Sequence, residues 1–360
     1  MNPRRRLWLL QGAALPWLAR GAGIDTRALG FPRDHGAHLE ARTEWWYATG
    51  WLGSEAAPTH GFQITFFRSR TGLADNGASR FAARHLLFAH AAVTQLAGGI
   101  HLHDQRIARW SGAADSALGR AAAGQGAVQI KDWSLIDDGL AWQARLPATD
   151  FAIELVLKRS QPLLLQGEAG LSRKGPEERQ ASRYYSEPQL AAAGRVTLRG
   201  RAVQGSGRAW LDHEWSDDIL HRDAVGWDWV GINLFDGGAL TAFRLRRADG
   251  SALWAGGSWR APGGAVRNFG AAEVRFTPGR VWRSAGSGAN YPVTWQVETP
   301  AGRHTVSALA DAQELDSRSG TGTIYWEGLS ELRELRDGQD RRVGLGYLEM
   351  TGYAGAIKLG

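Results

Sequence analysis

Residues 43–52 read TEWWYATGWL. In an extended chain alternate side chains point to opposite faces, so Trp45 and Tyr47 share one face while Glu44 and Trp46 share the other. Both faces of this stretch carry large apolar side chains, which indicates a strand that is covered on both sides. Such a strand is typical of a β-barrel or β-sandwich whose interior is not the only buried side.

Similar short runs of aromatic and β-branched residues recur to the end of the chain, separated by Gly, Pro or Asp-Gly, and no long apolar stripe of helical period follows. We therefore predict an all-β fold of antiparallel strands. Asp236-Gly237 and Asp249-Gly250 are strong hairpin signals. The expected strands are Gly61–Arg68, Phe88–Gln95, Ala127–Leu135, Leu140–Leu146, Phe151–Lys158, Arg195–Gln204, Gly226–Phe235, Ala239–Arg246 and Ala252–Trp259.

The chain has 360 residues, and at about 100–200 residues per domain this length predicts two domains. Gly205-Ser206-Gly207 interrupts the apparent strand pattern, so we expect the boundary near these residues. The predicted domains are residues 24–204 and residues 205–360, each an antiparallel β-barrel or β-sandwich.

The two predicted domains resemble each other weakly. Trp45-Trp46-Tyr47, with Phe67-Arg68 after it, compares with Trp227-Asp228-Trp229, with Phe243-Arg244 after it. A tandem of similar β-domains would explain this similarity. Within the first of them, residues 173–183 are rich in charged residues, Gly and Pro, and we expect an exposed loop that could rim a cavity mouth.

The first 23 residues have the pattern of an export signal. Arg4-Arg5-Arg6 precedes an apolar run, which ends in the small residues Gly21-Ala22-Gly23. The run is too short for a membrane span of about 20 apolar residues, and its Arg-Arg-x-Leu-Trp-Leu start favours a twin-arginine signal over a Sec signal. We therefore predict a signal peptide over residues 1–23 and a periplasmic or secreted protein.

Composition excludes several classes of function. Cysteine is absent, so disulfides, thiol nucleophiles and cysteine-bound zinc are excluded. Loss of the four arginines of the predicted leader lowers the formal net charge from +6 to about +2, and nucleic acid is not an expected partner. The 17 Trp and 47 Gly exceed ordinary usage and need a structural or chemical reason.

Motifs for metals and for common hydrolases are weak or missing. His101-Leu102-His103 has a spacing that could place two imidazoles on one strand face, but no third ligand follows at a typical spacing. No Gly-x-Ser-x-Gly elbow occurs, so a serine hydrolase is not expected. We predict neither a metal nor a cofactor.

The densest cluster of reactive side chains is the segment from Asp212 to Trp215. In an extended segment His213 and Trp215 share one face, while Asp212 and Glu214 share the other. Carboxyl and imidazole groups beside indoles suit a general acid or base in a desolvated pocket, where an acid can stay protonated at neutral pH. The alternative is an edge strand whose carboxylates serve in turns or in contacts with arginine.

Two further carboxylates lie among tryptophans. Asp228 stands between Trp227 and Trp229 and is a second candidate acid, with a salt bridge to Arg244 or Arg246 as the alternative. Glu44 resembles it, but Arg42 shares its face, and we expect Glu44 to have a structural role in such a pair.

Six separated aromatic motifs follow one another along the chain. They are Glu44-Trp45-Trp46-Tyr47, Tyr184-Tyr185-Ser186, Trp210–Trp215, Gly226–Trp229, Tyr325–Gly328 and Gly346–Tyr353. With these motifs the chain resembles the AttH-like and carotenoid 1,2-hydratase family, whose members are often labelled predicted secreted hydrolases. The resemblance runs from about Phe31 to Tyr353.

This resemblance implies two lipocalin-like β-barrel domains in tandem and a hydrophobic ligand, a lipid or isoprenoid, in or between them. It also implies acid-assisted hydration or isomerisation of that ligand, with the His-x-Trp pair of the hydratases at His213 and Trp215. The Tyr-x-Asp pair of those enzymes has no clear counterpart.

The indole faces near these motifs would stabilise a cationic intermediate by about 0.5–2 kcal/mol each. The candidate catalytic residues are His213, Asp212, Glu214 and Asp228, and the candidate ligand-binding residues are Trp215, Trp227, Trp229, Trp46 and Tyr185. The alternative function is a non-catalytic periplasmic lipid carrier or chaperone that works with an ABC-type export system.

Overall fold

The structure is a computed structural model that describes residues 27–73, 79 and 81–357. The predicted leader, residues 1–23, lies outside the described residues. Within the described part every strand pair is antiparallel, and the single helical element is a short 3-10 helix, η1 (Arg33–His35). The prediction of an all-β antiparallel fold is confirmed. Among these residues no helix has the length and apolar character of a membrane span.

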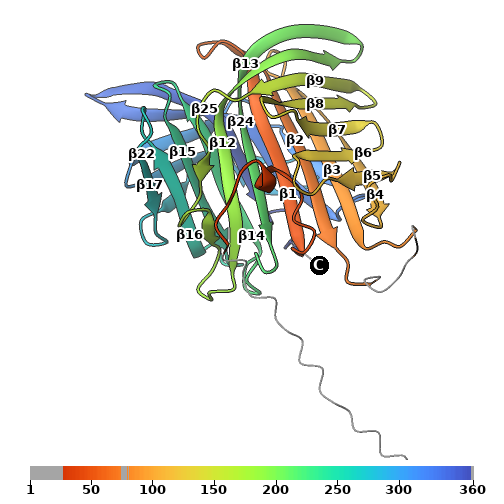
Figure 1. Cartoon of the computed structure of the whole chain (residues 1–360). Helices are drawn as coiled ribbons and strands as arrows, with labels where there is room; N and C mark the ends of the chain where they lie inside the picture. The colour runs from red at the N-terminus through yellow and green to blue at the C-terminus, as the bar shows by residue number, and fades with distance from the viewer. Residues whose placement is uncertain (1–26, 74–78, 80, 358–360) are drawn as a thin grey trace, which may run out of the picture.

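The first sheet has 13 strands in the order β4-β3-β2-β1-β13-β12-β9-β8-β7-β6-β5, with β10 and β11 paired to β12. Strands β5 and β6 approach β4 at the far edge, so the sheet curls until it is nearly closed (Figure 1). The bounds are β1 (Thr43–Gly53), β2 (Pro58–Arg70), β3 (His85–Gln95), β4 (Ile100–Trp110), β5 (Gly119–Ala121), β6 (Ala127–Ile130), β7 (Trp133–Asp137), β8 (Ala141–Pro147), β9 (Phe151–Lys158), β10 (Leu164–Leu165), β11 (Leu171–Arg173), β12 (Ala181–Leu198) and β13 (Arg201–Ser216).

The second sheet has 10 strands in the order β17-β16-β15-β14-β25-β24-β22-β21-β18, with β23 paired to β24, while β19 and β20 form a separate pair. The bounds are β14 (Gly226–Leu234), β15 (Ala239–Arg246), β16 (Ala252–Arg260), β17 (Val266–Phe269), β18 (Arg275–Pro278), β19 (Val281–Arg283), β20 (Asn290–Pro292), β21 (Thr294–Thr299), β22 (Gly302–Ala308), β23 (Glu314–Ser317), β24 (Thr323–Arg336) and β25 (Gln339–Thr351). Both Asp-Gly hairpins are present, between β14 and β15 and between β15 and β16.

Three details of the strand prediction are wrong. The expected strand Ala127–Leu135 contains the turn between β6 and β7, at Lys131 (φ 53°). The expected strand at residues 195–204 contains the reversal between β12 and β13, at Arg199 (φ 47°) and Gly200 (φ 82°). Gly205-Ser206-Gly207 does not interrupt a strand but lies inside β13. A Cβ atom on Gly207 would lie 1.9 Å from the carbonyl oxygen of Trp51, so this glycine allows β1 to approach closely. The chain changes sheet later, at residues 217–225, and the division into two domains stays a prediction.

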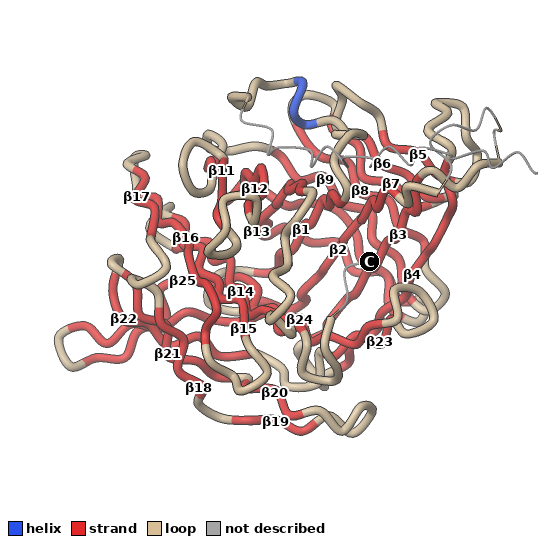
Figure 2. The backbone as a smooth tube through the Cα atoms, turned by 90° about the horizontal axis from the view of Figure 1, so that it is seen from below, coloured by secondary structure: helices blue, strands red, loops and turns tan. Residues whose placement is uncertain are grey.

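Strand β1 is covered on both faces, as its alternation predicts. Trp46 belongs to the core that the first sheet encloses, whereas Tyr47 belongs to a cluster that lies between the two sheets. Strand β14 has the same arrangement, with Val230 in the core of the second sheet and Trp229 in the shared cluster. Figure 2 shows the two sheets side by side, with β1 and β14 toward the middle. The molecule therefore has two separate cores and an apolar layer between the sheets.

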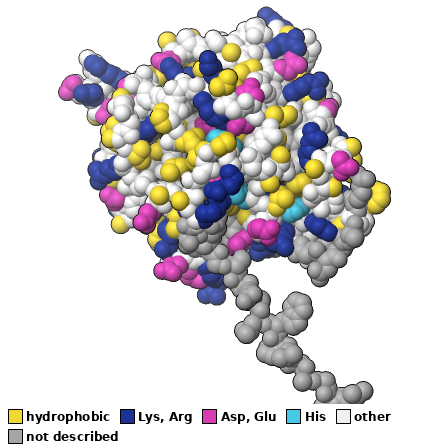
Figure 3. All heavy atoms as spheres, viewed as in Figure 1, with side chains coloured by type: hydrophobic (Ala, Val, Ile, Leu, Met, Phe, Trp, Pro, Cys, Tyr) yellow, Lys and Arg dark blue, Asp and Glu magenta, His cyan; other side chains and the backbone are white. Residues whose placement is uncertain are grey.

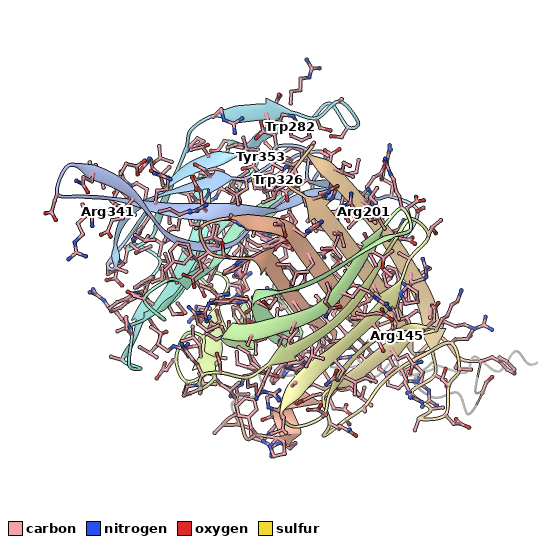
Figure 4. The ribbon with its side chains drawn as sticks, turned by 90° about the horizontal axis from the view of Figure 1, so that it is seen from above. Arg145, Arg201, Trp282, Trp326, Arg341 and Tyr353 are labelled. Atoms are coloured by element: carbon pink, nitrogen blue, oxygen red, sulfur yellow. The ribbon has the colours of Figure 1, made fainter. Side chains whose placement is uncertain are left out.

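Charged side chains lie mainly on the outside. On the face drawn in Figure 3, cationic and anionic side chains are interspersed. In Figure 4, Arg201 and Arg341 mark two hairpins on opposite sides of the molecule. Trp326 on β24 belongs to the core of the second sheet, and Tyr353, which follows β25, packs against that core.

Candidate functional site

A cavity of about 390 Å³ lies between the two sheets. Its walls come mainly from alternate residues of β1, β2, β3, β12 and β13 in the first sheet and of β14, β15, β24 and β25 in the second, because each strand presents every second side chain to this layer. The volume is within the range of sites for small organic ligands. The expected exposed loop at residues 173–183 is exposed only at residues 176–179, because its two ends belong to β11 and β12. Its buried Lys174 lines the cavity.

The lining is largely aromatic. Trp229 lies across from Tyr47 with ring centroids 5.4 Å apart, so β1 and β14 meet through aromatic side chains. Gly231 makes room for this indole, since a Cβ atom there would lie 2.2 Å from the Trp229 ring. The large apolar rings along the wall are those of Trp45, Phe67, Phe88, Trp227, Trp229 and Phe243.

Four carboxyl groups line the same cavity. Asp212 and Glu214 come from β13, Glu327 comes from β24 and Glu349 comes from β25. A carboxylate in so apolar a place must be paired, hydrogen-bonded or protonated. The four groups satisfy this requirement in different ways.

Asp212 accepts hydrogen bonds on both oxygens. Its Oδ1 accepts from Ser186 Oγ at 2.5 Å and from Trp210 Nε1 at 2.7 Å, and its Oδ2 accepts from Tyr184 Oη at 2.7 Å. Burial raises the pKa of Asp212 to about 7, although these three hydrogen bonds favour the ionised form. Asp212 is thus held in place by its donors, and it orients the Tyr184 hydroxyl.

Glu214 forms an ion pair with the one lysine of the cavity wall. Lys174 Nζ lies 2.9 Å from Glu214 Oε1, and the Ser182 hydroxyl donates to the same oxygen. The ammonium also lies over the rings of Tyr184 (4.7 Å) and Phe243 (4.3 Å). The opposite charges of Lys174 and Glu214 therefore balance each other within the cavity wall.

Glu327 and Glu349 are cross-strand neighbours on β24 and β25. Burial and the charge of Glu349 raise the pKa of Glu327 well above its usual value, and burial raises the pKa of Glu349 to about 7. Glu327 Oε1 and the hydroxyl of Tyr47, which interacts with Glu327, both lack a hydrogen-bond partner of good geometry among the described residues. Glu327 therefore has an unsatisfied oxygen at the cavity wall.

The opposite face of β13 carries a different centre, which we call the Glu44 centre and define as Glu44, Arg68, His38 and His213. Glu44 Oε2 accepts from Arg68 Nε at 2.8 Å, and its Oε1 lies 3.0 Å from His213 Nε2 and 2.8 Å from His38 Nδ1. Burial opposes ionisation, but the hydrogen bonds from His213 and His38 and the charge of Arg68 lower the pKa of Glu44 strongly. The centre contains an ionised carboxylate inside the first sheet.

Arg68, rather than Arg42, is thus the cationic partner of Glu44. The strand register explains the difference, because Glu44 and Arg68 lie directly opposite each other on β1 and β2. An adjacent strand provides this partner instead of the same strand. Glu44 is also tied to His213, which sequence analysis treated as a separate site.

His213 does not line the cavity. Its Nδ1 atom lies 3.2 Å from the Tyr185 hydroxyl, which also bonds His35 Nδ1 at 2.8 Å. Burial lowers the pKa of His213 to about 4, so its imidazole is neutral near pH 7. Trp46 stacks on this ring at 4.6 Å, and Trp215 stacks on the ring of His38 at 3.5 Å. These aromatic side chains hold the two imidazoles in place.

The Glu44 centre contains the types of ligand atom found in cation sites. His38, Glu44 and His213 each offer one ligand atom, and these atoms lie within 4.8 Å of one another. The buried guanidinium of Arg68 lies on the same carboxylate and opposes the approach of a second cation. The donor set fits a hydrogen-bonded ion pair better than it fits a metal site.

Asp228 points into the core of the second sheet. Its Oδ2 accepts from Arg244 Nε at 2.7 Å and lies 3.3 Å from Arg246 Nε, and Tyr353 donates to Oδ1 at 2.8 Å. The predicted alternative of a salt bridge to Arg244 or Arg246 is confirmed. Asp228 on β14 and Arg244 on β15 are paired in the same way as Glu44 and Arg68, which matches the internal similarity of the two halves.

The structure therefore divides the residues that sequence analysis grouped together. The cavity contains Asp212, Glu214, Trp227 and Trp229, whereas His213, Trp215, Trp46, Tyr185 and Asp228 lie away from it. Sequence analysis missed Glu327 and Glu349 as acids, although both occur in motifs quoted for the family resemblance. Only the pairing of β24 with β25 brings these two residues together.

Comparison with known proteins supports the family assignment. The model of the family described as AttH-like matches residues 23–353. A crystal structure described as an AttH from Nitrosomonas europaea shares 44% identity, with a TM-score of 0.82 over 92% of this chain and 98% of that chain. This likeness confirms the lipocalin-like fold class. No curated protein matches the chain.

Two more distant structures share the fold alone. Kievitone hydratase from Nectria haematococca has 12% identity and a TM-score of 0.67, over 92% of this chain and 95% of that chain. CghA has 12% identity and a TM-score of 0.54, over 86% of this chain and 88% of that chain.

Proposed function

This chain belongs to the AttH-like family, and we propose that it encloses an apolar, unsaturated small molecule, a lipid or isoprenoid, between its two sheets and catalyses acid-assisted hydration or isomerisation of it. The observation that carries this proposal is the aromatic cavity with carboxyl groups whose pKa values are raised to about 7 or above. The distant likeness to kievitone hydratase supports the same class of reaction.

The chemistry follows from the lining. Hydration of a carbon–carbon double bond requires a protonated acid, a cation that survives briefly, and water to capture it. A dry cavity keeps carboxyl groups protonated near neutral pH, and the faces of Trp227, Trp229 and Phe243 stabilise a nearby cation. Asp212 and Glu214 belong to this acid-base machinery, and Lys174 balances Glu214.

His213 takes an indirect part in this scheme. It shares strand β13 with Asp212 and Glu214 and is bonded to Glu44 on the far side, so it fixes the strand that carries two of the cavity acids. His213 is therefore proposed as a positioning residue. The leader predicted over residues 1–23 adds the proposal that the protein works in the periplasm or outside the cell.

The test is to identify by mass spectrometry the small molecules that co-purify with the full chain, and to incubate that extract with the protein in ¹⁸O-labelled water. We expect an unsaturated apolar ligand and a product that gains labelled oxygen or a shifted double bond. A ligand that stays bound and unchanged would instead identify a carrier, the alternative that works with an export system. A protein that carries no apolar molecule would contradict both functions.

A further inference from the structure

Glu327 and Glu349 form the least satisfied polar pair of the cavity wall. They lie opposite each other on adjacent antiparallel strands, an arrangement that places Cβ atoms about 4.5–5.5 Å apart. Glu327 is only 2% exposed, and its Oε1 has no hydrogen-bond partner among the described residues although it lines the cavity. Glu349 is more accessible and lines the same cavity.

The surroundings of the pair contain little that could stabilise two negative charges. Tyr47 from β1 faces Glu327, and the Trp227 side chain from β14 interacts with Glu349. The charges of Asp212, Glu214 and Asp228 also act on Glu349, and all three are negative and raise its pKa further.

On the other elements around the cavity, Lys174 is salt-bridged to Glu214, Arg244 and Arg246 are paired with Asp228, and the buried His90 bonds Tyr325. Arg68, which also lines the cavity, is paired with Glu44, so each of the lysine and arginine cations is engaged with another carboxylate. His90 is neutral near pH 7 because burial lowers its pKa to about 4. Two carboxyl groups at directly opposed positions of one cavity wall, without a cation of their own, cannot both ionise at low cost, so one proton remains on the pair.

We propose that Glu327 and Glu349 share one proton at neutral pH and present it to the cavity as the proton-donating site, for an alkene whose protonation leaves a tertiary or allylic cation. This inference rests on the proposed function for its reaction, but the shared proton is a property of the protein alone. Trp229, the register partner of Glu349 on β14, places an indole beside the position of the cation.

The step balances in atoms and electrons. The carboxyl O–H bond breaks, and its proton forms a C–H bond with the π electrons of the double bond, which leaves a cation on the neighbouring carbon. A lone pair of water forms the C–O bond, and the excess proton of that water returns to the carboxylate pair. In hydration, alkene and water become an alcohol, and the carboxyl pair regains its one proton. In isomerisation, the cation instead loses a carbon-bound proton to the pair and gives an alkene with a shifted double bond.

Asp212 is less suited to this role, although it lines the same cavity. Its oxygens already accept three hydrogen bonds from Ser186, Trp210 and Tyr184. Protonation would replace one of these acceptor positions by a donor and break a satisfied contact. In the Glu327–Glu349 pair, by contrast, Glu327 Oε1 has no hydrogen-bond partner among the described residues, so a proton on this oxygen displaces no donor.

The deciding experiment is infrared spectroscopy of the full chain near pH 7, because a protonated carboxyl has a C=O stretch distinct from that of a carboxylate. Because the pKa of Asp212 is also raised to about 7, the comparison is made in an Asp212→Asn background. We expect a carboxyl band in that background that is lost when Glu327→Gln/Glu349→Gln is added as a double variant. Glu334→Gln, on the same strand but outside the cavity, is the matched control and should keep the band. A band that persists in the double variant overturns the proposal.

A second arm tests whether the proton faces the ligand, with the acyclic isoprenoid farnesene as the probe and native mass spectrometry as the measure of occupancy. Bound farnesene should shift the carboxyl band, and an occupied protein with an unshifted band overturns the donor role. Failure to bind any apolar molecule would contradict the proposed function, while the infrared band would still decide whether the proton is shared.

Discussion

Glu44 and Glu327 are both buried glutamates, 0% and 2% exposed, yet their surroundings drive their pKa values in opposite directions. Glu44 lies inside the first sheet beside Arg68 and two imidazoles and is ionised. Glu327 lies between the sheets beside another glutamate and is protonated. Burial is common to both, so the partners decide the charge. The first centre stabilises the protein, and the second stores a proton next to a cavity.

The largest effect on stability is expected when the charge of Glu44 is removed. In Glu44→Gln the guanidinium of Arg68 remains buried without its counterion, and we expect a loss of about 3–5 kcal/mol in the free energy of unfolding by urea. Glu40→Gln, at a side chain 99% exposed, is the control and should change stability by about 0.5 kcal/mol or less. A loss in Glu44→Gln as small as that of the control would show that Arg68 does not depend on Glu44.

The second test follows stability against pH. The pKa of Glu349 is raised from 4.5 to about 7 in the folded state, so the folded protein keeps a proton that the unfolded chain loses. Wild-type stability should therefore fall as pH rises from about 4.5 to about 7. Because Glu349→Gln removes this titration, the variant should exceed the wild type at pH 8 by about 2–3 kcal/mol.

Glu44 provides the control for that test, because its contribution to stability changes with pH in the opposite direction. The lowered pKa of Glu44 contributes stability above pH 4.5 that is lost as the pH falls through the folded value. Glu44→Gln should thus flatten the acid limb of the stability curve and leave the limb near neutral pH unchanged. Identical pH profiles for Glu349→Gln and the wild type would mean that Glu349 titrates normally.

The smallest expected effect concerns the hydroxyl that links two imidazoles. Tyr185→Phe removes the bonds to His213 and His35 but keeps the ring, so we expect a loss of about 1–2 kcal/mol in unfolding free energy. The imidazole nitrogen resonances of His213 should shift in the NMR spectrum. Unchanged resonances would place the hydroxyl outside the hydrogen-bond network.

Local periodicity predicted part of this arrangement correctly. The alternation along residues 212–215 separates Asp212 and Glu214 from His213 and Trp215, and the structure has them on opposite faces. The two covered faces of β1 followed from the same rule. A period of two is a property of the strand itself, so no tertiary information was needed.

Strand pairing over long distances in sequence was not predictable in the same way. The contact between Glu44 and His213 joins residues 169 positions apart, and it exists because β1 pairs with β13. The pairing of Glu327 with Glu349 likewise depends on the register of β24 and β25. Sequence analysis recognised each segment but not its neighbour, which is why it assigned the acid to Asp212, Glu214 or Asp228 and assigned Glu44 to Arg42.

The position of the cavity between the sheets has a consequence for how such a protein can diversify. The inward side chains of β1 and β14 build two separate cores, while the outward side chains of the same strands form the cavity wall. Substitutions on the outward faces can alter which molecule is accepted without disturbing either core. Ligand preference in this architecture can therefore evolve, or be engineered, largely independently of the folding of either sheet.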